Sequence, residues 1–322
     1  MVSVSCITFN HAGYIRQALD SFLMQKTDFA YEILIHDDAS TDGTIEIIKE
    51  YEERYPDIIR PVLETENQYS KGISNISGVF NFPRARGRYI AMCEGDDYWS
   101  DPYKLQKQFD LMESDAGYSL CCHSAGIIYE NEAFGGEALI KPFKGSGEIS
   151  PEEMISKRTN IPTASMFFRT EYAKSLPDWY FDCPVGDIPL QLYLVLKGRM
   201  YYIDEPMSVY RSGSAGSWQE SMDKDESRLF AKWEAHYSAM ERLYRAFDAE
   251  SGGKWRESVD EALRRQRFHI DLKEGKASVV KDSSNRLFVS ELPASEARLQ
   301  RIKADLPWLY ELMRRAYKLI KR

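Results

Sequence analysis

The sequence is poor in the features that mark several common classes of protein. Its five cysteines are odd in number and lack the spacing of zinc ligands, which disfavours a disulfide scaffold and a zinc site. No apolar run approaches about eighteen residues, and no basic region precedes the first apolar run, so we expect neither a transmembrane helix nor a signal peptide. Residues 1–215 contain 20 Lys and Arg against 32 Asp and Glu, which argues against a nucleic-acid binder.

The composition that remains is that of a globular protein. Hydrophobic residues make up 43% of the 322 residues and aromatic residues 13%, enough for a large core. A free cysteine in an apolar run behaves as a small hydrophobe, so we expect all five thiols to be buried. These features predict a protein of a reducing compartment, namely the cytoplasm or the inner face of the cell membrane.

Segments with strand and helix periodicity alternate along the first two thirds of the chain. We expect strands at 2–9, 31–35, 58–63, 89–93 and 118–129, and helices at 14–24, 44–55 and 104–114. A short strand at 165–169, a helix at 188–196 and strands at 200–203 and 207–210 follow. Strands separated by helices of this length predict an α/β fold with a mostly parallel sheet flanked by helices.

Beyond residue 218 the sequence becomes charged, helix-forming and poor in β-branched residues. We therefore expect an α/β domain of residues 1–218 and an all-helical C-terminal region of residues 219–322. Within 306–322, apolar side chains fall on one helical face and basic side chains on the other. Such a helix docks on its own protein or a dimer partner, or it lies on an anionic membrane surface.

Acidic residues gather where two strands end. Glu94, Asp96 and Asp97 follow the strand at 89–93, and Asp37 and Asp38 follow the strand at 31–35. Ligands of open α/β sheets bind at the carboxyl ends of the strands. Crowded carboxylates repel one another, and Mg²⁺ or Mn²⁺ relieves this repulsion while bridging to a substrate phosphate. An ordinary solvated turn is the alternative interpretation.

The run from Asp37 to Thr44 also has two interpretations. Capping of the helix that follows accounts for Ser40, Asp42 and Gly43. It does not account for two adjacent carboxylates at the strand end. A carboxylate at that place can accept a hydrogen bond from the ring N–H of a pyrimidine or guanine base, so we favour ligand binding.

Four segments together resemble the N-terminal half of family 2 glycosyltransferases, which have the Rossmann-like GT-A fold. They are Thr8-Phe9-Asn10, residues 37–44, residues 85–90 and Glu94-Gly95-Asp96-Asp97. Their order and spacing fit the family, and the resemblance covers about residues 2–215. It implies a nucleoside-diphosphate sugar donor, Mn²⁺ or Mg²⁺ as cofactor, and inverting transfer. The Gln-x-x-Arg-Trp motif of the processive synthases is absent from the sequence, which predicts a non-processive enzyme.

The resemblance assigns donor-binding roles by position. Thr8, Phe9 and Asn10 would line the pocket of the nucleotide base, and Asp38, with Asp37, would hold the base.

Glu94-Gly95-Asp96 occupies the DXD position of the family. Asp96 would be the metal ligand, Glu94 would face the ribose or the donor sugar, and Asp97 would contact the sugar. Gly95 belongs to the same donor-binding turn.

Three later residues complete the predicted site. Asp187 resembles the general base at the start of a helix, with a helix N-cap as the alternative. Arg211 suits a diphosphate because its guanidinium bonds two oxygens at once. The Ser- and Gly-rich loop after it leads to Trp218, which would pack on the donor; a simple linker is the alternative. His11 and His36 lie near the predicted base pocket, but we expect them to be packed or solvated.

The sequence therefore predicts a metal-dependent inverting hexosyl- or N-acetylhexosaminyl-transferase. It would use a nucleoside-diphosphate sugar, with a UDP-sugar favoured, and a glycan or lipid-linked acceptor in surface polysaccharide synthesis. The alternatives are a nucleotidyltransferase that makes the activated sugar and a glycan-binding module with a degenerate site.

Overall fold

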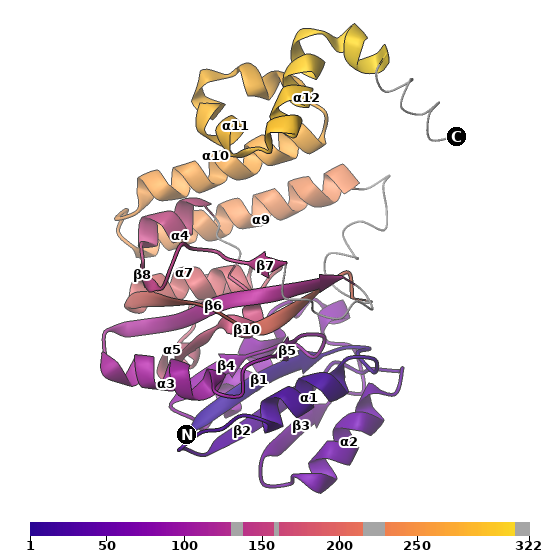
Figure 1. Ribbon diagram of the computed structural model, residues 1–322, viewed down its shortest axis with the longest axis vertical. Helices are drawn as coiled ribbons and strands as arrows, with labels where there is room; N and C mark the ends of the chain where they lie inside the picture. Colours follow the sequence, from indigo (N-terminus) through magenta and orange to yellow (C-terminus); the bar gives the residue numbers. More distant parts are fainter. Residues whose placement is uncertain (130–137, 158–160, 215–228, 313–322) are drawn as a thin grey trace.

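The computed structural model describes residues 1–129, 138–157, 161–214 and 229–312, and a ten-stranded sheet organises it. The strands are β1 (Val2–Thr8), β2 (Tyr31–Asp37), β3 (Ile59–Leu63), β4 (Tyr89–Met92), β5 (Tyr98–Trp99), β6 (Tyr118–Tyr129), β7 (Leu139–Ile140), β8 (Gly147–Ile149), β9 (Phe167–Arg169) and β10 (Arg199–Ser212). Their order is β3-β2-β1-β4-β9-β6-β10-β5, with β7 beside β6 and β8 beside β10 (Figure 1).

The half of the sheet built first along the chain is parallel. β1 pairs in parallel with β2 and β4, and β2 pairs in parallel with β3. The helices α1 (Ile15–Leu23) and α2 (Thr44–Arg54) form the βαβ crossovers that the sequence predicted. The register places Thr8 beside Asp37, so the polar residues after both strands lie at one edge of the sheet.

The other half of the sheet mixes both directions. β6 and β10 are parallel, whereas β9 runs antiparallel to β4 and β6, and the short strands β5, β7 and β8 are antiparallel to their neighbours. The α/β fold with flanking helices is confirmed, and its sheet is mixed. β10 is one strand where the sequence predicted two. Its pairing with β6 shifts around Pro206, which has no N–H for the ladder, yet the strand continues to Ser212.

Alternate strand residues face two hydrophobic layers, one on each side of the sheet. Ile33 and Ile35 of β2 belong to a layer that includes Leu19 and Phe22 of α1. Leu34 belongs to the opposite layer, to which four helices later in the chain contribute. These are α4 (Pro151–Lys157), α5 (Thr170–Ala173), α6 (Asp178–Phe181) and α7 (Asp187–Lys197). The helix α3 (Lys104–Ser114) packs on β6.

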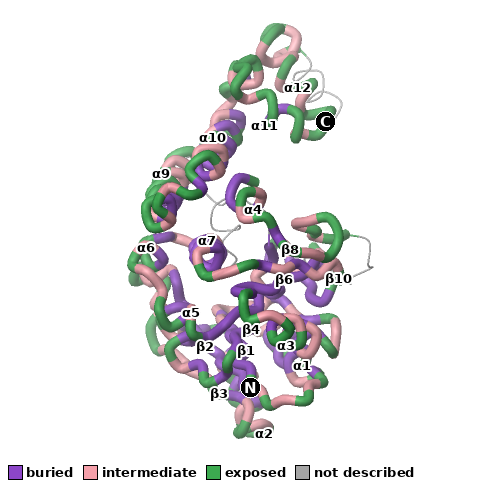
Figure 2. Tube along the Cα trace, turned by 90° about the vertical axis from the view of Figure 1, so that its left-hand side faces the viewer, coloured by how far each residue is buried: buried purple, intermediate pink, exposed green. Residues whose placement is uncertain are grey.

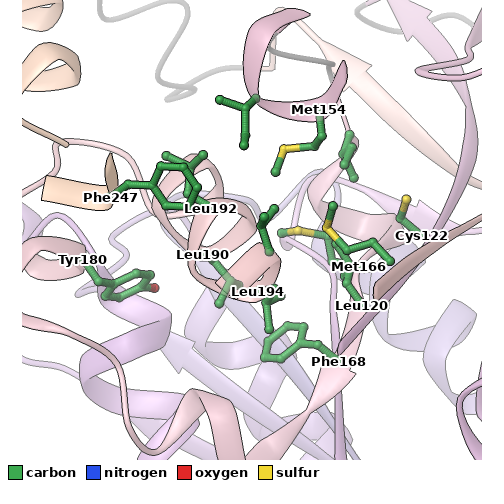
Figure 3. Close-up of a cluster of buried hydrophobic side chains, with 14 of the residues drawn as sticks. Leu120, Cys122, Met154, Met166, Phe168, Tyr180, Leu190, Leu192, Leu194 and Phe247 are labelled. Atoms are coloured by element: carbon green, nitrogen blue, oxygen red, sulfur yellow. The ribbon is translucent and has the colours of Figure 1, made fainter. Parts of the chain in front are cut away.

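The second layer continues into the C-terminal helices. Phe247 of α9 (Leu229–Glu250) belongs to the same buried cluster as Leu190 and Leu192 of α7 (Figure 3). The next helix, α10 (Arg256–Lys273), packs against α9 and α4. The sheet and these two helices thus share one core.

The last helices pack much less. α11 (Arg286–Glu291) and α12 (Ala294–Asp305) are mostly exposed or intermediate (Figure 2), and Phe288 contributes to a small separate cluster with Phe268 and Leu272 of α10. The predicted helix at 306–322 is described only to Leu312. Across the described ranges, no helix combines the length and apolarity needed to cross a bilayer. All five cysteines are buried and free, as predicted.

Candidate active site

The acidic turn after β4 is joined to the end of β1. The backbone N–H of Cys93 donates to the carbonyl of Ser5 at 3.1 Å, and the N–H of Gly95 donates to the carbonyl of Ile7 at 2.9 Å. A Cβ atom at Gly95 would stand 2.8 Å from Thr8 Oγ1, so only glycine permits this approach. Glu94, Asp96 and Asp97 are thereby held at the carboxyl edge of the sheet beside Thr8.

Four carboxylates at this edge repel one another. Burial, followed by the charges of Asp96 and Asp187, raises the pKa of Glu94 to about 8. Burial, followed by the charges of Asp96 and Glu94, also raises the pKa of Asp97. Asp187, which is far away in sequence, therefore lies within the field of the acidic turn. A cation or a cationic ligand group entering here would relieve the repulsion.

Arg211 holds the acidic turn from the end of β10. Its backbone N–H donates to Asp97 Oδ1 at 2.9 Å, and its Nε donates to the carbonyl of Asp96 at 3.1 Å. Its Nη2 donates to Gln17 at 3.0 Å, and the guanidinium lies 4.6 Å from the ring centroid of Tyr14. In this structure the guanidinium of Arg211 therefore holds the backbone of the acidic turn, and its backbone N–H holds the carboxylate of Asp97.

The loop after β10 also contacts the turn. Ser214 Oγ donates to Asp96 Oδ2 at 2.5 Å, while the second oxygen of Asp97, Oδ2, is buried without a hydrogen-bond partner. Trp218 lies outside the described residues, so its predicted packing on the donor stays a prediction.

The two carboxylates after β2 are engaged by neighbouring backbone. Asp37 is fully buried and accepts from Ser40 N at 2.9 Å and from Ser40 Oγ at 2.5 Å. Asp38 accepts from the N–H of Gln68 at 2.6 Å and from the N–H of Tyr69 at 3.0 Å. Both side chains therefore stabilise loops, and their predicted contact with a base stays a prediction.

Asn10 and Thr8 also belong to this corner. Asn10 has a positive φ of 55°, and its Oδ1 accepts from Thr41 N at 2.8 Å, which ties the turn after β1 to the turn after β2. Thr8 Oγ1 is buried and has no hydrogen-bond partner among the described residues. Phe9, between them, is half-buried.

Asp187 is the first residue of α7, and Gly186 takes the N-cap position without a side-chain cap. The structure thus does not use Asp187 as the N-cap, which was the alternative to a catalytic role. The charge of Asp187 contributes to the raised pKa of Glu94, so the first turn of α7 lies near the acidic edge.

His11 is a candidate site residue that the sequence analysis placed near the base pocket without giving it a role. It was expected to be packed or solvated, and its Nδ1 is indeed buried without a partner. Its Nε2, however, stands 3.9 Å from Asp96 Oδ2. Its place three residues after the end of β1, at the carboxyl edge, is the signal that could have identified it.

The carboxylate oxygens of the acidic turn suit a divalent cation that completes its coordination with substrate phosphates. In the part of the chain that the structure describes, no three side chains of His, Cys, Asp or Glu stand close enough to hold a metal by themselves. Mg²⁺-type ions are commonly held by one or two carboxylates plus substrate phosphates. Asp96, with the unpaired Oδ2 of Asp97 nearby, offers such a partial set.

Comparisons with known proteins identify the family of the chain. The model of "Glycosyl transferase family 2" matches residues 3–175. An uncharacterized protein of Mycobacterium tuberculosis is 35% identical over 264 residues, which cover 80% of this chain and 71% of the relative. The putative teichuronic acid biosynthesis glycosyltransferase TuaG of Bacillus subtilis is 34% identical over 125 residues, 38% of this chain and 47% of TuaG.

Solved structures share the fold. Residues 1–349 of Staphylococcus aureus TarS, in complex with UDP-GlcNAc, align with a TM-score of 0.59 and 17% identity over 94% of this chain and 79% of that chain. At this identity the likeness concerns the fold alone.

Proposed function

The chain belongs to glycosyl transferase family 2, and on this premise we propose that it is a metal-dependent, inverting and non-processive sugar transferase. The donor is a nucleoside-diphosphate sugar, and the acceptor is a glycan or a lipid-linked glycan of surface polysaccharide synthesis. The observation that carries the proposal is the shared field of Glu94, Asp96, Asp97 and Asp187 at the carboxyl edge of the sheet.

The donor side of this edge is the turn after β4. Asp96, with Asp97 beside it, would hold Mn²⁺ or Mg²⁺, and the ion would stabilise the charge that develops on the leaving diphosphate. Ser214, which now donates to Asp96 Oδ2, would give up this contact when the cation and diphosphate are bound. Glu94 would face the ribose or the donor sugar from the same turn.

The acceptor side is the first turn of α7. In a single displacement, the acceptor oxygen forms a bond to the anomeric carbon while the bond from that carbon to the diphosphate oxygen breaks. Asp187 takes the proton of the acceptor hydroxyl, which makes it the general base. Inversion follows because the acceptor attacks opposite the leaving group.

The choice of substrates draws on named relatives. TuaG is a putative glycosyltransferase of teichuronic acid biosynthesis, and the TarS structure contains UDP-GlcNAc. A UDP-hexose or UDP-N-acetylhexosamine is therefore the first donor class to test. A nucleotidyltransferase is disfavoured, because Asn10 and His11 after β1 are tied to Ser40 and Thr44 and no Lys or Arg is present in 9–14 to grip a triphosphate.

Calorimetry with UDP and Mn²⁺, combined with assays of UDP release from UDP-sugars with membrane glycan extracts, tests the proposal. Asp96→Ala should lose metal-dependent UDP binding. Asp187→Asn should keep that binding and lose transfer by about 10²- to 10⁴-fold. Asp260→Asn, in the C-terminal helices, is the matched control and should change neither.

Two results would overturn separate parts of the proposal. Absence of metal-dependent binding of any nucleotide would indicate a glycan-binding module. Full transfer by Asp187→Asn would remove the base assignment while leaving donor binding intact.

A further inference from the structure

The chain between β3 and β4 connects both sides of the candidate site. It includes three short helical segments, η1 (Tyr69–Lys71), η2 (Ser77–Asn81) and η3 (Phe82–Arg84). At one end, the backbone of Gln68 and Tyr69 is anchored on Asp38, and Asn67 Nδ2 donates to the carbonyl of Asp38 at 3.1 Å. This end therefore contacts the predicted nucleotide side.

The other end of the connection contacts the chain that leads into α7. Asn75 Nδ2 donates to the carbonyl of Tyr180 at 2.7 Å and to the carbonyl of Cys183 at 3.1 Å. Ser74 Oγ donates to the same carbonyl of Cys183 at 2.7 Å. Both hydrogens of one amide group are thus used on the segment that ends at Asp187.

Close packing accompanies these hydrogen bonds. A Cβ atom at Gly78 would stand 2.5 Å from the ring of Tyr180, and one at Gly186 would stand 2.9 Å from Asn75 Oδ1. Two glycines therefore allow the connection to lie directly against α6 and the start of α7. A side chain at either position would push the two segments apart.

Asn75 is an energetically unfavourable residue for a buried position. The residue is 3% exposed, and its Oδ1 is buried with no hydrogen-bond partner in the described ranges. A buried acceptor without a hydrogen bond destabilises the folded state, because it has lost its water and gained no partner. An apolar residue would avoid this cost but would lose the two N–H donors that hold the carbonyls before α7.

We propose that Asn75 is a positioning residue, which fixes the first turn of α7 and so sets where the Asp187 carboxylate stands relative to the bound donor. The inference rests on the proposed role of Asp187 as base. Asparagine suits the task because its short side chain delivers two N–H groups to two carbonyls. Aspartate at this position would offer no donor and would repel both carbonyls.

The same connection supplies a matched control. Asn67 and Asn75 both donate to backbone carbonyls, but Asn67 contacts the Asp38 side and Asn75 contacts the Asp187 side. We expect Asn75→Ala to lower kcat for transfer about 10²-fold, since a displacement of about 1 Å can cost that much. Its affinity for UDP with Mn²⁺ should stay within about twofold of the unaltered protein.

Asn67→Ala should show the opposite pattern, with weaker UDP binding and little change in kcat. Hydrogen exchange of the peptide 184–190 should accelerate in Asn75→Ala and not in Asn67→Ala. Ser74→Ala, which removes one of the three hydrogen bonds, is the milder variant if Asn75→Ala folds poorly, and it should lower kcat in the same direction.

The outcomes separate this inference from the proposed function. If Asp187→Asn abolishes transfer while Asn75→Ala and Ser74→Ala keep the kcat of the unaltered protein, the positioning role is wrong and the base assignment stands. Equal losses of UDP affinity and kcat in Asn75→Ala would also overturn it, because they would indicate a general structural role.

Discussion

The sheet region (residues 2–212) and the helical region (residues 229–312) place charge differently. In the sheet region Glu32, Asp97 and Lys104 are buried, and burial lowers the pKa of Lys104 to about 7. In the helical region charges pair at the surface, as Arg245 does with Asp260, whose side chains are 49% and 40% exposed. A buried charge costs several kcal/mol unless it is well paired, whereas an exposed pair contributes about 0–1 kcal/mol.

The difference shows where the molecule accepts an electrostatic cost. Among the described residues of the helical region, the buried groups Asp248 and Arg265 both have ionic partners, although Asp248 Oδ1 has no hydrogen-bond partner. The carboxylates at the end of β4 instead face one another, and Asp97 Oδ2 has no hydrogen-bond partner among the described residues. Carboxylates that repel one another are thus gathered at the candidate site, as expected where a ligand completes the arrangement.

The sheet region and the helical region differ in charge but share a hydrophobic core. The buried cluster that contains Phe168 of β9 and Leu190 of α7 continues through Phe247 of α9 to Trp255 at the start of α10. The predicted boundary near residue 218 therefore marks a change in composition, and the hydrophobic core continues across it. Within the described part of the helical region, only the cluster around Phe288 is separate from the sheet.

The first prediction tests this shared core. Phe247→Ala removes a fully buried ring and should destabilise the protein by about 3–5 kcal/mol. Phe247 lies in the buried cluster that joins both regions, so unfolding in denaturant should stay a single transition. Far-UV circular dichroism and tryptophan fluorescence measure this transition. Phe288→Ala, in the separate cluster, is the control and should leave the main transition in place. Loss of the helical signal alone in Phe247→Ala would indicate two independent units.

The second prediction concerns the acidic edge without metal or nucleotide. The pKa of Glu94 is raised to about 8 in the folded protein from a model value of 4.5, so the folded state binds this proton more tightly than the unfolded chain. Stability should therefore fall as the pH rises from about 5 to about 8, by roughly 2–4 kcal/mol because the neighbouring carboxylates share the repulsion.

Denaturant titrations at the two pH values measure this effect, and Glu94→Gln should remove most of it. Glu234 in α9 is the control, because hydrogen bonds from Arg267 lower its pKa. Its contribution is complete above about pH 4.5, so Glu234→Gln should keep the pH dependence of the unaltered protein. An unaltered slope in Glu94→Gln would show that Glu94 does not carry the repulsion.

The third prediction compares one arginine from each region. Arg84 donates to the carbonyls of Ile35 and Arg60 at 2.7 Å and to Asn81 Oδ1 at 2.8 Å, joining the β3–β4 connection to the sheet. Arg84→Met leaves these acceptors unsatisfied and should cost about 2–3 kcal/mol. Arg245→Met removes the surface pair with Asp260 and should cost less than about 1 kcal/mol. Equal losses in chemical denaturation would contradict the comparison.

The sequence predicted those parts of the fold that have long periodic patterns. β1, β2, α2, α3 and β6 were placed to within about two residues, because each has several turns or alternations. The antiparallel strands β5, β7 and β8 have only two or three residues each, too few to show a period. Asp204, Glu205 and Pro206 interrupt the apolar pattern of β10, which is why one strand was predicted as two.

Site residues were predictable where they follow a strand and unpredictable where a loop folds over them. Asp96 and Asp97 follow β4 and lie at the expected edge because β1 and β4 are parallel and end there together. Asp187 begins α7 and was predicted from its likeness to a family motif. The engagement of Asp38 by the N–H groups of Gln68 and Tyr69 depends on an irregular connection that carries no periodic signal. The contacts of Asn75 across more than a hundred residues were equally invisible in the sequence.

The smallest expected effect on stability lies at the end of the helical region. Trp308 and Leu312 are 67% and 58% exposed, so Trp308→Ser should change the free energy of unfolding by less than about 0.5 kcal/mol. Residues 313–322 contain five Lys and Arg and no Asp or Glu. If this surface meets an anionic membrane, the unaltered protein should sediment with phosphatidylglycerol vesicles and the variant should not.

If the surface instead mediates a dimer, sedimentation velocity should show a dimer that Trp308→Ser dissociates, with no vesicle binding. Tyr129→Ser, at an aromatic residue of β6 that is also more than half exposed, is the control for both measurements. If the protein is a monomer that binds no vesicles, both predicted roles of the C-terminal surface are wrong. Either positive result would place a function of the helical region on its surface, in contrast to the buried charges of the sheet region.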